Sequence, residues 1–115
     1  MTISHEAPPL TSRVNVASID RMIAEAVRPG VAMPKRATLV MHISALTNDV
    51  KMLLPEVPRE RAEYERAQGL VLPRARPGPG ASHYELWQYS LTLAHAAQDL
   101  LDVAQQEAGT HVPQR

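Results

Sequence analysis

Two long stretches of this chain carry apolar residues at alternating steps of four and three positions. This spacing places each set along one face of an α-helix. In residues 34–54 the set is Leu39, Ile43, Leu46, Val50 and Leu53, and in residues 82–108 it is Leu86, Tyr89, Leu93, Ala96, Leu100 and Val103. Because a helix with one apolar face has to bury that face, the pattern predicts an all-α fold: a small helical bundle with two long helices and one or two shorter ones.

Proline, glycine and capping residues predict where the first two helices begin and end. The first helix is expected over residues 15–28, with Asn15 as its N-cap and a Pro-Gly pair directly after it. The second helix is expected over residues 34–54. Pro34 is typical of a first helical turn, and Pro55 is incompatible with a continuing helix.

The second half of the chain contains a weak helical signal, an irregular loop and the strongest helical signal. A short exposed helix is expected in residues 58–68, ending at Gly69. Residues 70–81 contain too many Pro and Gly residues for a regular element. Ser82 and Glu85 have the spacing of a capping box, which starts the last helix.

The length of 115 residues favours a single domain. We expect a flexible N-terminal arm at residues 1–13, a single helical domain at residues 14–109 with a Pro/Gly-rich loop at 70–81, and a C-terminal tail at residues 110–115. Hydrophobic residues make up 44% of the chain but aromatic residues only 3%, so the core has to consist mainly of aliphatic side chains.

A second apolar strip follows the last helix, beside the first one. Its members are Tyr84, Trp87, Leu91, Ala94 and Leu101. One antiparallel neighbouring helix covers one strip, so the second strip needs another helix, a second subunit or a ligand. A small aliphatic core also gains from extra burial, and we therefore expect a homodimer.

The composition argues against several classes of function. Twelve Lys and Arg residues balance twelve Asp and Glu residues, whereas nucleic-acid-binding proteins usually carry a basic excess, so we expect no nucleic-acid partner. The absence of Cys excludes disulfides, a thiol nucleophile and a Cys-ligated metal. We find no metal-ligand spacing and no nucleotide-binding motif, so no metal and no cofactor is expected.

No apolar run approaches the roughly 20 residues of a membrane span, and the first residues lack the layout of a signal peptide. We therefore expect a cytoplasmic protein without a membrane partner.

Three of the four aromatic residues of the chain lie within six positions, at Tyr84, Trp87 and Tyr89. Tyr89 belongs to the first apolar strip and is expected in the core. Tyr84 and Trp87 have three open interpretations: core residues, a dimer interface or the wall of a ligand site. Trp and Tyr suit the last two because each combines a large apolar body with a polar tip.

His42 is the best-placed titratable residue of the chain and our candidate catalytic residue. It lies at the edge of the apolar face of the second predicted helix, residues 34–54, where a histidine is either a structural boundary residue or a group for proton transfer. Asp49 follows seven positions later on nearly the same line, and Arg36 lies near the start of the same helix, so the three are expected to line one groove. In the loop, Arg74 and Arg76 are candidates for holding a carboxylate above the aromatic strip, or they only make the loop soluble. With Tyr84 and Trp87, these residues form the candidate substrate-binding set.

The segment ALTNDVKMLLPEVPRE, residues 45–60, resembles small helical accessory proteins of actinobacterial natural-product gene clusters. In those proteins a long helix ends in a similar Leu-Leu-Pro-x-Val turn and a second long helix follows, as residues 82–108 do here. Within that group, the size and layout are similar to the cyclases that form the lysinoalanine bridge of cinnamycin- and duramycin-type lanthipeptides. The resemblance implies an accessory enzyme that adds a Lys amine of a modified peptide substrate to a dehydroalanine. It supplies no residue-by-residue catalytic motif.

The implied reaction is compatible with this composition. A free Lys amine has a pKa near 10.4, so making it neutral at pH 7 costs roughly 4–5 kcal/mol, which a general base or a desolvating pocket can supply. Neither a metal, a cysteine nor a nucleotide is needed. The other function that the sequence leaves open is a non-catalytic helical binding or regulatory module. A concave, aromatic-lined and partly polar pocket would favour the enzyme, and a second strip sealed by another helix would favour the module.

Overall fold

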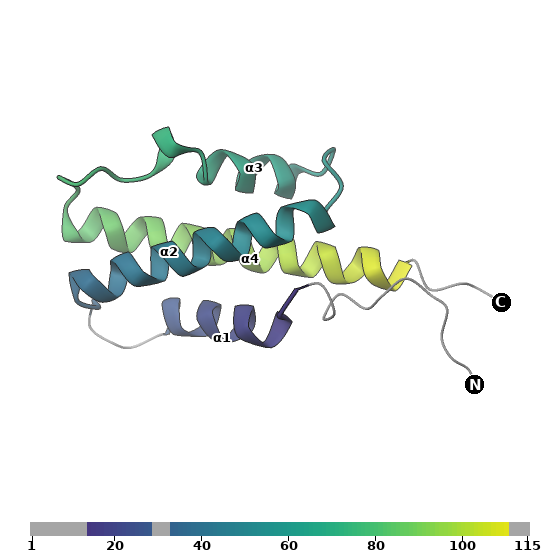
Figure 1. Ribbon diagram of the computed structural model, residues 1–115, viewed down its shortest axis with the longest axis horizontal. Coiled ribbons are helices and arrows are strands. Elements are labelled where there is room, and N and C mark those ends of the chain that lie inside the picture. The colour runs from purple at the N-terminus through teal and green to yellow at the C-terminus, as the bar shows by residue number, and fades with distance from the viewer. Residues whose placement is uncertain (1–13, 29–32, 111–115) are drawn as a thin grey trace.

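The structure is a computed structural model, and it describes residues 14–28 and 33–110. All regular elements of these residues are helical, which confirms the predicted all-α fold with two long helices (Figure 1). The helices are α1 (Val16–Ala26), α2 (Arg36–Leu53), α3 (Ala62–Leu70) and α4 (His83–Thr110), with two short 3₁₀ turns at Leu54–Glu56 and Pro73–Ala75. The predicted arm at 1–13 and the residues 111–115 of the predicted tail lie outside the described residues.

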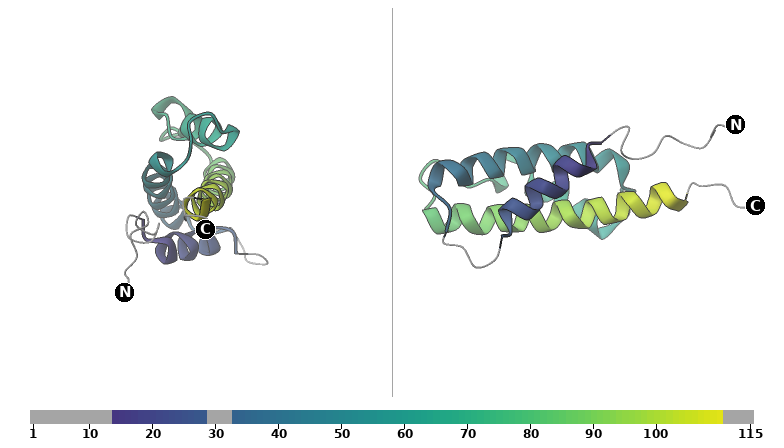
Figure 2. Two further views of the ribbon diagram at one scale, coloured as in Figure 1. Left: turned by 90° about the vertical axis from the view of Figure 1, so that its right-hand side faces the viewer. Right: turned by 90° about the horizontal axis from the view of Figure 1, so that it is seen from below.

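The two long helices α2 and α4 lie side by side and form the centre of the molecule. They run in the same direction, because α3 leads the chain back along them before α4 begins (Figure 1). Their first turns are joined: a guanidinium nitrogen of Arg36 donates to the carbonyl of Pro79 at 3.3 Å, and the imidazole of His83 contacts the carbonyl of Pro34. Seen end-on, α3 and α1 flank this pair on opposite sides (Figure 2).

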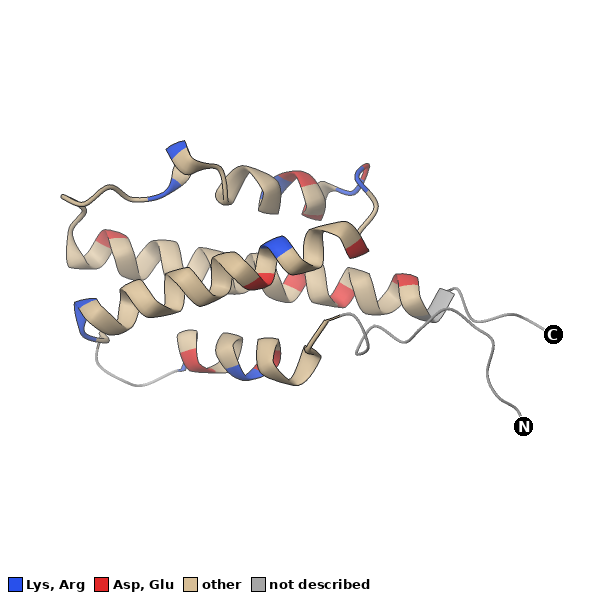
Figure 3. Ribbon diagram, in the orientation of Figure 1, with Lys and Arg blue, Asp and Glu red and all other residues tan. Residues whose placement is uncertain are grey.

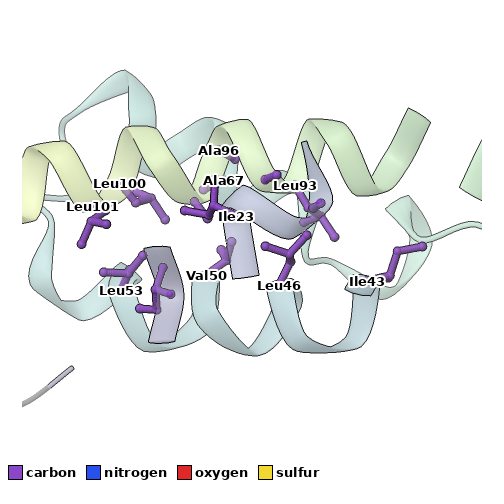
Figure 4. Packing of buried hydrophobic residues seen from close by; sticks show 14 of the residues in the cluster. Ile23, Ile43, Leu46, Val50, Leu53, Ala67, Leu93, Ala96, Leu100 and Leu101 are labelled. Atoms are coloured by element: carbon purple, nitrogen blue, oxygen red, sulfur yellow. The ribbon is translucent and has the colours of Figure 1, made fainter. Parts of the chain in front are cut away.

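Both predicted apolar faces are buried, as expected. The side chains from α2 and α4 point toward one another between the two helices (Figure 4). Leu39, Leu46, Leu53, Leu93 and Leu100 have no exposed surface at all. Burying a side chain of this kind typically contributes about 1.5–3 kcal/mol, so the two faces hold the helices together.

Helix α1 covers part of the second strip of α4. It lies across the surface of α2 and α4 and buries Ile19, Ile23 and Ala26 (Figure 2). On α4, Ala94 and Leu101 are buried as well, whereas Trp87 is partly buried. A single chain therefore buries only part of the strip that motivated the dimer, since Leu91 is also partly buried and Tyr84 is exposed.

The ends of α1, α2 and α4 follow the local chemistry that predicts them. The side chain of Asn15 accepts a hydrogen bond from the Ser18 amide at 3.0 Å, as an N-cap does. The capping box of α4 is complete: Ser82 Oγ accepts from the Glu85 amide at 3.0 Å, and Glu85 Oε1 accepts from the Ser82 amide at 2.7 Å. Helix α2 begins at Arg36, slightly later than predicted, and Pro55 lies in the 3₁₀ turn that ends it.

The predicted boundaries of α3 were wrong at both ends. The helix begins at Ala62 because Pro58 first forms a tight turn, in which the Arg61 amide donates to the Pro58 carbonyl. At the other end it passes through Gly69 to Leu70. Residues 70–81 also contain a regular element, the 3₁₀ turn at Pro73–Ala75, in which the first residue is a proline whose fixed φ suits that position.

Candidate functional site

The antiparallel crossing of α1 and α2 brings a carboxylate next to the only buried histidine among the described residues. Glu25 lies in the last turn of α1, and its side chain is half exposed. His42 lies in the second turn of α2 and is only 4% exposed. The His42 Nε2 and Glu25 Oε1 atoms are 3.7 Å apart, which is too long for a direct hydrogen bond but places the imidazole next to the carboxylate.

Both side chains face a cavity of about 240 Å³ between α1, α2 and α4. The wall combines the apolar surfaces of Ala26, Pro34 and Trp87 with polar groups. The complete lining is Glu25, Ala26, Arg28, Pro34, Thr38, His42 and Trp87. Arg28 also pairs with the other carboxylate oxygen of Glu25 at 3.7 Å. The site is therefore concave, aromatic-lined and partly polar.

The two ring nitrogens of His42 differ in their surroundings. Nε2 faces the Glu25 carboxylate, whereas Nδ1 is buried and has no hydrogen-bond partner among the described residues. A buried N–H without an acceptor is costlier than a buried lone pair, so this arrangement favours the tautomer with the proton on Nε2. The imidazole thus presents its N–H toward the carboxylate.

The aromatic cluster separates into three environments. Tyr89 is a core residue, as predicted, and its hydroxyl donates to the carbonyl of Leu70, which ties the end of α3 to α4. Burial raises the pKa of the Tyr89 hydroxyl, and the nearby charge of Arg76 partly opposes this shift. Trp87 lines the cavity. Tyr84 is 58% exposed and meets Trp87 edge-to-face, with 6.2 Å between ring centroids, so it is not part of the core.

The other predicted site residues do not join His42 and Trp87. Arg36 and Arg76 line a second cavity of about 220 Å³, on the side of Val40, Ile43 and Leu86. Arg74 is exposed in the 3₁₀ turn after α3 and lines neither of these two cavities.

Asp49, which was expected in one groove with His42 and Arg36, also lines neither cavity. It is half-buried on α2, and this burial raises the pKa of its carboxyl group. A desolvated carboxyl group loses more on ionisation than an exposed one, which explains the direction of the shift.

Glu25 and Thr38 are cavity residues that sequence reasoning missed. Both are polar residues of amphipathic helices, and at either position an exposed surface residue is the ordinary interpretation. The pairing of Glu25 with His42 depends on where α1 crosses α2. No spacing within one helix carries that information.

The described residues contain no group of three or more His, Asp or Glu side chains arranged to hold a metal ion. Within the same part of the chain, none of the helices is both long and apolar enough to cross a membrane. Comparison of the chain with protein-family models, with curated proteins and with solved structures finds no match.

Proposed function

We propose that this protein is a cofactor-free enzyme that transfers protons in the cavity between α1, α2 and α4. The observation that carries the proposal is the Glu25–His42 pair, which faces a Trp-lined cavity from two different helices. An imidazole paired with a carboxylate is a common device for general acid–base catalysis, and a water-poor wall strengthens its interaction with a substrate charge.

The reaction is the one that the resemblance of residues 35–108 implies: closure of a lysinoalanine bridge in a ribosomal peptide during natural-product biosynthesis. The Lys ammonium of the peptide loses one proton to the Glu25 carboxylate of the Glu25–His42 pair, which makes its nitrogen nucleophilic. That nitrogen bonds to the β-carbon of dehydroalanine, and the π electrons move into the enolate of the adjoining carbonyl. The α-carbon then takes the proton back from the pair. The product is a secondary ammonium with no net gain or loss of atoms.

The size of the cavity limits which part of the peptide enters it. An apolar cavity of roughly 150 Å³ holds a molecule as large as benzene, so about 240 Å³ accommodates the reacting side chains but not a whole cyclic peptide. The remaining peptide would lie outside the cavity. Catalysis would then come mainly from holding the amine and the alkene in reactive geometry.

The proposal is tested by incubating a dehydroalanine-containing peptide that has one Lys with and without the protein and measuring ring closure. Ring closure does not change the mass, so loss of the vinyl protons is followed by NMR, or the remaining dehydroalanine is trapped with a thiol. We expect Glu25→Gln and His42→Gln each to lower the rate roughly 100-fold or more, as loss of a general acid–base group does. His95→Gln, which changes an exposed histidine of α4, is the matched control and should leave the rate unchanged.

The non-catalytic helical binding or regulatory module is the second candidate. Its support is that Ala94 and Leu101 are already buried within the single chain, so part of the second strip serves the fold and not a partner. A native protein that binds the peptide and leaves the vinyl protons unchanged would favour this module over the enzyme. The predicted homodimer and the cytoplasmic location remain predictions under either function.

A further inference from the structure

The second cavity is lined by two arginines from distant parts of the chain. Arg36 is the first residue of α2, and Arg76 follows the 3₁₀ turn after α3. Both line the cavity of about 220 Å³, and the nine side chains and backbone segments around it include no acidic residue. Figure 3 shows cationic positions at the start of α2 and on the segment that follows α3.

The remainder of the lining is largely apolar. Val40, Ile43 and Leu86 contribute aliphatic surface, and Pro77 and Pro79 contribute their rings. One nitrogen of the Arg36 guanidinium donates to the Pro79 carbonyl at 3.3 Å, which holds this side chain against the loop. A guanidinium has five N–H donors, so the remaining donors of Arg36 are available to a ligand.

We propose that this cavity binds a carboxylate that is carried on a short aliphatic body, such as the C-terminal carboxylate of a peptide that ends in Leu or Val. The guanidinium fork matches a carboxylate with two parallel hydrogen bonds. The aliphatic body contacts Val40, Ile43 and Leu86. The site does not depend on the Glu25–His42 chemistry, because it shares no lining residue with that cavity.

A phosphate is the other anion that arginines commonly bind, and this cavity suits it less well. Phosphate sites usually rely on a run of backbone N–H groups, whereas Pro77 and Pro79 remove two such donors from the loop. The aliphatic wall also offers nothing to a hydrated phosphate. Glu85 lines a neighbouring cavity together with Pro77 and Gly78, and its Oε1 already accepts from the Ser82 amide.

The experiment is a titration of the ¹³C-methyl-labelled full chain, followed by NMR. The probes are N-acetyl-leucine, its uncharged amide and inorganic phosphate. We expect N-acetyl-leucine to shift the methyl signals of Val40, Ile43 and Leu86, and to bind at least about tenfold tighter than the amide, because charge-assisted hydrogen bonds are lost with the charge. Phosphate is expected to bind more weakly than N-acetyl-leucine.

Three variants test whether Arg36 and Arg76 bind the carboxylate. Arg36→Gln and Arg76→Gln are each expected to weaken N-acetyl-leucine binding about tenfold or more. Lys35→Gln removes one charge beside Arg36 without touching the cavity, and should change binding less than about twofold, as expected for an exposed charge. Circular dichroism checks that each variant is folded, and both arginines are exposed, so we expect native helix content.

Equal binding of the acid and the amide, or tighter binding of phosphate, would overturn the proposal. So would an equal loss in Lys35→Gln, because binding would then follow the general charge of this end of the molecule. No dehydroalanine peptide enters this experiment, so its failure would leave the proposed reaction untouched, and the failure of the reaction would leave this site untouched.

Discussion

His42 is an unfavourable choice for the interior of a small helical domain. Its Nδ1 atom is buried and has no partner in the described part of the chain, and a buried polar atom left in this state costs about 1–3 kcal/mol. Leu or Met at position 42 would extend the apolar face of α2 without that cost. A side chain that lowers stability and faces a cavity is a candidate for function, because perturbed and unsatisfied groups are concentrated at sites of chemistry.

Asp49 provides a test of residue-level electrostatics that does not depend on any function. Burial raises the pKa of its carboxyl group in the folded chain, while the unfolded chain keeps the ordinary value near 3.9. Between these two values the folded state binds more protons than the unfolded state, so the free energy of unfolding falls as the pH rises from about 4 through the raised pKa. We expect Asp49→Asn to remove this fall. The difference in the free energy of unfolding between Asp49→Asn and the native chain should therefore shift in favour of the variant between pH 4 and pH 7.

The measurement is urea denaturation of the native chain and of Asp49→Asn at several pH values between 4 and 7. Asp20→Asn, which changes an exposed aspartate of α1, is the control and should run parallel to the native chain. If Asp49→Asn loses as much stability with rising pH as the native chain does, Asp49 is not the source of the pH dependence.

At the residue level, sequence reasoning found His42 and Trp87 but not their partner. His42 stands out because its position is adjacent to a run of buried aliphatic residues, and Trp87 because it is the only Trp of the chain. Glu25 has no such contrast, since a glutamate near the end of an exposed helix is ordinary. The groove predicted for Arg36, His42 and Asp49 assumed that the three residues share one helix face. In the structure His42 and Arg36 line two different cavities, and Asp49 lines neither of them.

Local chemistry explains the long helices better than it explains α3. The start of α4 is specified within four residues by the Ser82–Glu85 capping box, and its apolar spacing extends over several turns. Helix α3 has nine residues and one buried side chain, Ala67. Helices this short are marginal in isolation, so their ends are set by tertiary contacts. The bond from Tyr89 to the Leu70 carbonyl and the ion pair of Arg66 with Asp99 at 3.5 Å are contacts of this kind.

Gly69 tests whether α3 continues to Leu70. The residue lies within the helix, and a Cβ atom added there would meet no heavy atom within 4 Å. Ala has a higher helix propensity than Gly, so we expect Gly69→Ala to raise the free energy of unfolding by about 0.5 kcal/mol, a value at the low end because the position is close to the helix end. Urea denaturation measures the change. A loss of stability would mean that Gly69 ends the helix in a conformation that only glycine adopts easily, as the sequence alone predicted.

For the whole molecule, the sequence predicted the class of fold, but the expectation of an antiparallel neighbour for the apolar face of α4 was wrong, because α2 and α4 run in the same direction (Figure 1). The two apolar faces of α2 and α4 fit a parallel or an antiparallel pair equally well, because a strip of aliphatic side chains carries little directional information. The direction is set by α3 and the following loop, which return the chain to the start of α2. Two contacts then join the starts of α2 and α4: the side chain of Arg36 with the carbonyl of Pro79, and the side chain of His83 with the carbonyl of Pro34. These contacts link residues more than 40 positions apart, which no local pattern indicates.

The predicted homodimer is the last property of the whole molecule to be tested. Since Ala94 and Leu101 are buried within the single chain, the Tyr84 end of the second strip is the part left for a second copy. Light scattering at micromolar concentration is therefore expected to give about twice 12.7 kDa for the native chain, and 12.7 kDa for Tyr84→Glu, because a buried unpaired charge at an interface is strongly unfavourable. Met41→Glu is the matched control, because Met41 of α2 is 60% exposed and Tyr84 is 58% exposed. Both variants add one charge to an exposed apolar position, but only Tyr84→Glu should change the mass. A native mass of 12.7 kDa would contradict the dimer and show that α1 supplies all the cover that the second strip of α4 requires.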